Sequence, residues 1–318
     1  MKSTFRDSLG QACEVIPGFA NSVFQGDRGG GNSGYFQSEQ NCTQPDSTRA
    51  RLEGVANRVQ LAARLLDSVA PAANGPALVI GASHGEECLW LADQLGDRCD
   101  RIIGTNLTEL DPFDGGVLKA FSDISGNPEH AAHCSDRIEL CRDDIATSSL
   151  PTGHFTRVCS WQTFEHVMDP RAGFENVSRV LRPGGVGYIE YNPFFSIDGA
   201  HWPATIDIPW AHARMENTEF ERAVFTLHPD RQKDAVSFVH RAINRMTQQQ
   251  MLGYAHDAEL EIVAFLPRIR TEDLLSLTPQ IVNGVRALYP LASPSDLAAR
   301  IVRVVVRKPP DAAETRAD

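Results

Sequence analysis

The sequence predicts an α/β protein built on a doubly wound, mostly parallel β-sheet. Short apolar runs alternate with helical patterns between residues 77 and 191, as βα units do. The first run, residues 77–80, lies between Pro76 and Gly81 and is too short for a helix. It turns through Gly81-Ala-Ser-His-Gly85 into residues 86–95, whose apolar residues recur at helical spacing. A strand, a glycine turn and a helix in this order open nucleotide-type sites in such sheets.

The composition is that of a globular protein and restricts its partners. The chain has 318 residues, of which 42% are hydrophobic and 22% charged. Its formal net charge of −11 argues against a nucleic-acid partner, because phosphate contacts need clustered lysine and arginine. The basic residues are almost all arginine, a bias typical of GC-rich bacterial genomes.

The cysteine pattern and the hydropathy predict a soluble cytoplasmic protein. Seven cysteines are scattered without CxxC spacing, which favours reduced thiols over disulfides or a zinc site. No stretch reaches the about 18 apolar residues of a membrane span, and the first thirty residues contain no signal-peptide core. We therefore expect no membrane partner.

We expect two parts in the chain. Residues 1–70 form an N-terminal arm and an amphipathic helix that act as a lid, because residues 1–45 are rich in Gly, Ser, Asn and Gln and residues 48–69 have helical periodicity. Residues 71–318 form the main domain. Within it, residues 192–246 contain prolines and clustered aromatics and are expected to be an irregular insertion.

The remaining elements follow from periodicity and from glycine and proline positions. Strands are expected at 77–81, 101–106, 137–142, 156–161, 186–191, 260–266 and 300–307. Helices are expected at 86–95, 116–124, 170–180 and 248–256, and residues 271–300 are helical in pattern.

Five stretches carry a resemblance to one family. They are Val79-Ile-Gly-Ala-Ser-His-Gly85, Gly104-Thr-Asn-Leu-Thr108, Asp143-Asp-Ile145, Ser160-Trp-Gln-Thr-Phe-Glu-His-Val167 and Arg179-Val-Leu-Arg-Pro-Gly-Gly185. In order and spacing the chain resembles the class I S-adenosylmethionine-dependent methyltransferases of the small-molecule branch. The resemblance implies a seven-stranded Rossmann-like sheet whose last strand is antiparallel, with the cofactor across the C-terminal ends of the first strands.

The resemblance also implies which residues bind S-adenosyl-L-methionine. The turn residues Gly81, Ala82, Ser83 and Gly85 would face its methionine and ribose. Asn106 stands where the family usually has a ribose-binding acid, and an amide can still donate to and accept from a diol. Two departures concern the methionine end: Val79 replaces an acid, and Ser83 replaces a glycine.

The adenine and sulfonium contacts are implied in the same way. Leu107 would pack on the adenine, and Ile145 would lie on the face of the ring. Asp144 would accept from the adenine amino group, with Asp143 as the neighbouring candidate. Gln162 would lie beside the sulfonium.

Candidate catalytic residues are histidines, because a hydroxyl acceptor must lose a proton. His201 is the first candidate because it follows the fifth strand among aromatic residues, His166 is the second, and His212 is weaker. Glu190, Asp198 and Asp207 are alternatives that could orient the acceptor. Glu165 and His166 with the neutral amide of Gln162 make a poor site for a hard cation, so no metal is expected.

The expected function is transfer of a methyl group to a small-molecule or glycan-like acceptor, at oxygen. Alternatives are N- or C-methylation, a family member that binds the cofactor without methyl transfer, and a plain interaction protein. The acceptor and the oligomeric state stay open, a homodimer included.

Overall fold

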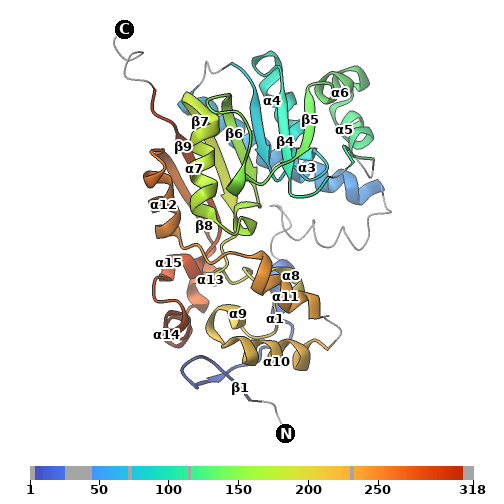
Figure 1. Cartoon of the computed structure of the whole chain (residues 1–318). Helices are drawn as coiled ribbons and strands as arrows, with labels where there is room; N and C mark the ends of the chain where they lie inside the picture. The colour runs from blue at the N-terminus through green and yellow to red at the C-terminus, as the bar shows by residue number, and fades with distance from the viewer. Residues whose placement is uncertain are drawn as a thin grey trace.

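A seven-stranded sheet forms the upper half of the molecule in the computed structural model (Figure 1). The structure describes residues 4–25, 45–70, 74–109, 111–113, 116–229 and 233–310. The strand order is β5-β4-β3-β6-β7-β9-β8, and only β9 runs antiparallel to its two neighbours. The predicted seven-stranded sheet with an antiparallel last strand is therefore confirmed.

The strands lie within a few residues of the predicted ranges. Their bounds are β3 Ala77–Ile80, β4 Ile102–Asn106, β5 Ile138–Arg142, β6 Phe155–Trp161, β7 Leu181–Tyr191, β8 Glu261–Ile269 and β9 Ala299–Arg307. The central strands β3 and β6 are buried along their whole length, because helices cover both faces of the sheet. β7 begins five residues before the predicted strand, since Leu181 already pairs with Phe155.

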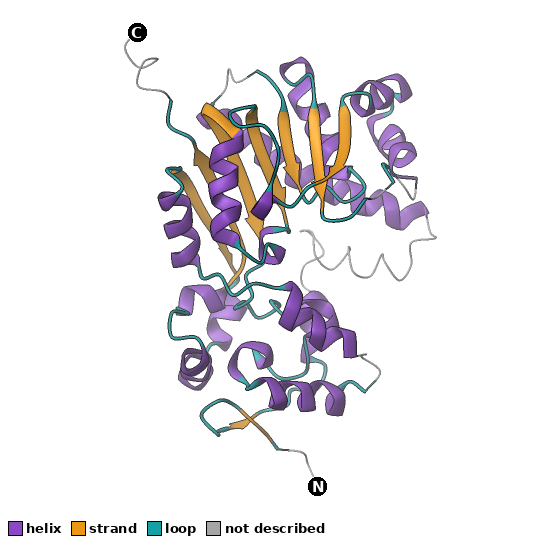
Figure 2. Cartoon of the chain, viewed as in Figure 1, coloured by secondary structure: helices purple, strands orange, loops and turns teal. Residues whose placement is uncertain are grey.

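Two groups of helices cover the two faces (Figure 2). On one face lie α3 (Pro45–Val69), α4 (Glu86–Leu95), α5 (Val117–Ser125) and α6 (Pro128–Ser135). The other face carries α7 (Pro170–Val180) and α12 (Gln248–Asp257), which contact one another and share a core with β3 and β6. The sequence analysis missed α6, whose start is marked by the cap residue Asn127 and by Pro128.

A second, mainly helical body packs below the sheet (Figure 1). It contains α1, the helices that follow β7 and the helices between β8 and β9. Their bounds are α1 Phe19–Gln25, α8 His201–Ala204, α9 Ala211–Arg214, α10 Asn217–Leu227, α11 Lys233–Ala242, α13 Thr271–Ser276, α14 Pro279–Leu288 and α15 Pro294–Ala298. The predicted irregular insertion 192–246 thus holds four helices, α8 to α11.

The N-terminal segment belongs to this helical body. Residues 4–25 form a short hairpin, β1 (Phe5–Arg6) with β2 (Ala12–Cys13), followed by α1. Phe5 and Phe24 are buried in the same cluster as Phe194 and Trp210, and Asp207 accepts hydrogen bonds from the amides of Gly18 and Ala20. The sequence analysis groups this segment with α3, whereas α3 packs on the sheet. The middle of the predicted arm, residues 26–44, lies outside the described residues.

No helix in the described ranges is long and apolar enough to cross a membrane.

Candidate active site

The turn after β3 is shaped by two glycines with positive φ. Gly81 has φ +75°, and a Cβ at this position would lie 2.0 Å from Thr163 Oγ1. Gly85 has φ +95°, and a Cβ there would lie 2.8 Å from the ring of Phe113. Ser83 takes a left-handed conformation with φ 49°, a backbone conformation that favours glycine.

Asn106 at the end of β4 holds this turn in place. Its side-chain oxygen accepts from Ser83 N–H at 2.8 Å, and its side-chain nitrogen donates to Ser83 C=O at 2.9 Å. A carboxylate cannot make both bonds, because it has no hydrogen to donate. The side-chain amide of Asn106 therefore stabilises the turn, whether or not a ligand is bound.

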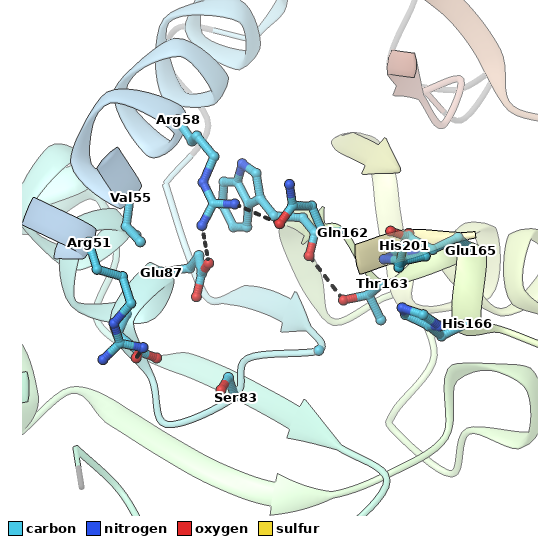
Figure 3. Close-up of a pocket in the computed structure, with 13 residues that line it drawn as sticks. Arg51, Val55, Arg58, Ser83, Glu87, Gln162, Thr163, Glu165, His166 and His201 are labelled. Carbon is cyan, nitrogen blue, oxygen red and sulfur yellow. Dashed lines mark hydrogen bonds and ion pairs between the residues drawn. The ribbon is translucent and has the colours of Figure 1, made fainter. Parts of the chain in front are cut away.

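A cavity of about 210 Å³ opens beside the turn, between the sheet and the helical body (Figure 3). Several chain segments line it: α3, the β3–α4 turn, the start of α4, the segment after β6 and the start of α8. The lining residues are Arg51, Val55, Arg58, Gly81, Ser83, Glu86, Glu87, Trp161, Gln162, Thr163, Glu165, His166 and His201. The cavity lies at the C-terminal ends of β3 and β6, where the strand order reverses, as expected for ligand sites in such sheets.

One end of the cavity carries two arginine–glutamate pairs. Arg51 of α3 donates to Glu86 at 2.6 Å, and Arg58 donates to Glu87 at 2.9 Å. The second guanidinium nitrogen of Arg58 reaches Gln162 Oε1 at 3.1 Å (Figure 3). Burial raises the pKa of Glu87 to about 7, against the lowering effect of Arg58.

The sequence analysis did not single out these four charged residues. A signal existed, since Arg51, Val55 and Arg58 recur at spacings of four and three and so share one face of a helix. Which face of α3 meets the cavity is decided by packing on the sheet.

The other end of the cavity brings together Glu165, His166 and His201. Glu165 and His166 lie in the single helical turn η4 (Phe164–His166) after β6, and His201 begins α8. One ligand atom from each of the three lies within 4.8 Å of the others. Both predicted catalytic histidines therefore lie at one place, with Glu165 beside them.

Burial shifts the pKa values of Glu165 and His201. It raises the pKa of Glu165 to about 7, against the lowering effect of His166. It lowers the pKa of His201 to about 3, with His166 and His212 adding to the effect. His201 is therefore neutral at physiological pH.

Several residues that line the cavity have a strained backbone conformation. Six non-glycine residues in the described ranges have positive φ, and three of them, Ser83, Gln162 and His201, line it. Such conformations cost about 1–3 kcal/mol each and are typical of functional sites.

A second cavity of about 660 Å³ lies next to the first, along the ends of β4 and β5. It is lined by His84, Asn106, Thr108, Glu109, Asp111, Pro112, Leu140 and Cys141. His84 follows Ser83 of the first cavity directly, so the two form neighbouring parts of one edge of the sheet.

Several predicted cofactor residues line neither cavity. Leu107 is 59% exposed, and Ile145 is buried in the core beneath the strand ends. Asp143 accepts from Ser149 N–H, and Asp144 accepts from Ala146 N–H and caps the turn η3 (Ile145–Thr147). Ala82 is fully buried, and Gly85 precedes α4. Their proposed contacts with cofactor stay predictions.

The other polar candidates have structural partners. His212 is buried, and its Nε2 lies 2.8 Å from Phe194 C=O. Glu190 accepts from Tyr188 and Arg303, and Asp198 accepts from Ser196. These residues and Asp207 do not line the cavity.

Comparison with known proteins supports the family that the sequence motifs indicate. Residues 78–189, from β3 to β7, match the family model of a methyltransferase domain. Residues 78–189 therefore form a methyltransferase domain. The chain matches no curated protein at a significant level.

The solved structures that match the chain are distant in sequence. An S-adenosylmethionine-dependent methyltransferase from Mesorhizobium loti is 16% identical, with 80% of this chain and 99% of that chain covered and a TM-score of 0.46. For geranyl diphosphate C-methyltransferase from Streptomyces coelicolor, the identity is 13%, the coverage 78% and 77%, and the TM-score 0.45. The [4+2]-cyclase SpnF is 17% identical, with coverage of 79% and 82% and a TM-score of 0.41.

The residues of the first cavity fit the methionine end of S-adenosylmethionine. Arg58 Nε is buried and has no hydrogen-bond partner among the described residues, although its other nitrogens are engaged. A carboxylate is the natural acceptor for such an atom, and the glutamates of α4 suit an ammonium group. When bound, the cofactor supplies an activated methyl group on its sulfonium sulfur. The residues that would hold its methionine part are Arg51, Arg58, Glu86, Glu87 and the turn at Ser83.

Proposed function

We propose that this methyltransferase transfers the methyl group to an oxygen atom of a small-molecule or glycan-like acceptor. The observation that carries the proposal is the group Glu165, His166 and His201, which shares one cavity with the glycine turn. A hydroxyl must lose its proton to become a nucleophile, whereas an amine carries its own lone pair. The Glu165 carboxyl group and the neutral imidazole of His201 at the acceptor end suit the hydroxyl.

The rest of the site contributes by holding the acceptor and the cofactor in the geometry that methyl transfer needs. Methyl transfer needs the acceptor atom in line with the carbon–sulfur bond, and holding two reactants in place supplies much of the rate. Gln162 lies between the two ends of the cavity, fixed by Arg58. We propose that the N-terminal segment and the insertion 192–246 build the acceptor side, which is supported by their shared core and by the position of His201.

The first experiment tests cofactor binding at the methionine end. In isothermal titration, Arg58→Met is expected to weaken S-adenosylmethionine binding by about 10- to 100-fold, the range for a hydrogen bond between charged groups. Arg49→Met on the same helix is the matched control, because Arg49 is exposed and pairs with the exposed Glu53. If Arg58→Met binds as well as the unchanged protein, Arg58 does not hold the carboxylate.

The second experiment identifies the methylated atom. The protein is incubated with methyl-labelled S-adenosylmethionine and a small-molecule extract, and the labelled product is identified by mass spectrometry. A label on oxygen supports the proposal, and a label on nitrogen or carbon overturns it. Tight cofactor binding without any labelled product would favour the alternative of a family member that binds the cofactor without transferring methyl. Bacterial origin and cytoplasmic location stay predictions of the sequence.

A further inference from the structure

The group at the acceptor end combines two imidazoles and one carboxylate from separate parts of the chain. Glu165 and His166 follow β6, and His201 follows β7. The His166 and His201 ring centroids lie 5.3 Å apart, and Phe238 packs on both rings. His201 is held with φ 56°, a left-handed conformation that a non-glycine residue rarely adopts.

The buried carboxylate of Glu165 is the first observation that indicates a cation site in this group. Its side chain is 1% exposed, and neither carboxylate oxygen makes a well-aligned hydrogen bond within the described residues, although the backbone amides of Glu165 and Asn192 act to lower its pKa. A buried carboxylate without a partner is costly, because burial removes its hydration. A cation between Glu165 and the histidines would remove that cost.

His166 is oriented as a metal ligand usually is. Its Nδ1 lies 2.6 Å from Ala242 C=O, so Nδ1 carries the hydrogen and Nε2 keeps the lone pair. Metal-binding histidines commonly donate their other ring N–H to a carbonyl or carboxylate in this way.

We propose that Glu165, His166 and His201 bind one divalent transition-metal ion of the kind that imidazole favours, such as Zn²⁺, Fe²⁺ or Co²⁺. Two ligand atoms each about 2.1 Å from one ion are at most about 4.2 Å apart, so ligand atoms within 4.8 Å of one another need to approach by less than about 1 Å to share an ion. The sequence analysis considers Gln162 as the third ligand. The structure instead commits Gln162 to Arg58 and supplies His201.

The ion would define the class of acceptor, and this step rests on the proposed function. Three protein ligands leave coordination positions open toward the cavity that Gly81 and Gln162 also line. An acceptor that presents a hydroxyl oxygen, with a second oxygen nearby, is the chemical class that fills such positions.

The test uses the untagged full-length protein, stripped with a chelator and titrated with Co²⁺ as the probe. We expect one equivalent per chain, seen by visible absorption and by elemental analysis. Glu165→Gln and His201→Ala are each expected to weaken Co²⁺ binding by at least about 100-fold, the upper part of the range known for losing an outer-shell partner. His256→Ala is the control, because His256 is exposed and far along the chain on α12.

Co²⁺ binding below one equivalent, or binding that Glu165→Gln leaves unchanged, overturns the metal proposal. Glu165→Gln preserves side-chain size, so it decides the matter even where His201→Ala fails to fold. S-adenosylmethionine is titrated into the stripped protein in parallel. If the stripped protein binds the cofactor but not Co²⁺, only the metal proposal is overturned. If the stripped, folded protein does not bind the cofactor, the proposed function is overturned.

Discussion

At Gly81, at the edge of the cavity, both the backbone conformation and the space around the Cβ position require glycine. Its φ of +75° disfavours any side chain, and the side chain of Thr163 occupies the space where a Cβ would point. The close neighbour comes from the segment after β6, so this glycine joins the ends of β3 and β6. The need for glycine here arises from packing within the protein as well as from room for a ligand.

Gly81→Ala is expected to lower the free energy of unfolding by about 3 kcal/mol or more, which combines the left-handed conformation with the overpacking against Thr163. The measurement is denaturant unfolding. Gly126→Ala separates the two causes, because Gly126 has φ +68° and no atom within 4 Å of its Cβ position. This control is expected to cost only about 1–2 kcal/mol. Equal losses in both variants would show that the contact with Thr163 has no effect.

At the scale of elements, α3 connects the cavity with the back of the sheet. Its first half supplies Arg51 and Arg58 to the charged end of the cavity. Near its end, Asp67 accepts from Arg98 at 2.7 Å and from Arg157 at 3.3 Å. Arg157 lies on β6 and is completely buried, so Asp67 is a counter-charge for a guanidinium inside the protein.

Asp67→Asn is expected to destabilise the protein by about 1–3 kcal/mol at neutral pH, because it leaves buried charge on Arg157. Burial by itself would raise the pKa of Asp67, but Arg98 and then Arg157 lower it below its usual value. The stabilisation is therefore complete above the unfolded pKa of about 4 and is lost as the pH falls through the lowered folded pKa.

The check is the pH dependence of unfolding. The variant should lose less stability on acidification below about pH 4 than the unchanged protein does. Asp123→Asn is the control, since Asp123 is exposed and lies 3.9 Å from its partner Lys119. An identical acid dependence in Asp67→Asn and the unchanged protein would contradict the assignment.

At the scale of the whole molecule, Arg300 on β9 joins the sheet to the helical body. It donates two hydrogen bonds to Asp273 of α13, at 2.5 and 2.8 Å, and one to Val23 C=O of α1, at 2.7 Å. Asp198, in the segment after β7, lies 3.8 Å away. Arg300 therefore links β9 to α1, to α13 and to the segment that leads to His201 at the cavity.

Arg300→Met is expected to cost about 3–5 kcal/mol, because Asp273 would remain buried without a partner. Hydrogen exchange should rise first in α1 and α13, ahead of the central strands. Arg307→Met on the same strand is the control, since Arg307 pairs with the exposed Glu261 and its loss should cost less than about 1 kcal/mol. Uniform exchange across both bodies would show that Arg300 does not couple them.

The sequence alone predicted the sheet and most of the helices that cover it. This was possible because the periodic recurrence of apolar residues that marks a strand or a helix is a local property of the sequence. Helix 86–95 and helix 170–180 coincide with α4 and α7. The helices α8 to α11 between residues 201 and 242 were missed, since prolines and aromatics there obscured short amphipathic segments. The glycine turn was also predictable, because glycine positions mark it directly.

The site was decided by tertiary structure. Sequence motifs pointed to Gly81, Gln162 and the two histidines. They could not show that His201, 35 positions after His166 in the chain, meets Glu165 and His166. They could not show that Arg58 of a separate helix faces the same cavity, or that Asn106 is bonded to Ser83. Local sequence determines which segments form strands and helices; the packing of the helical body on the sheet determines which side chains meet.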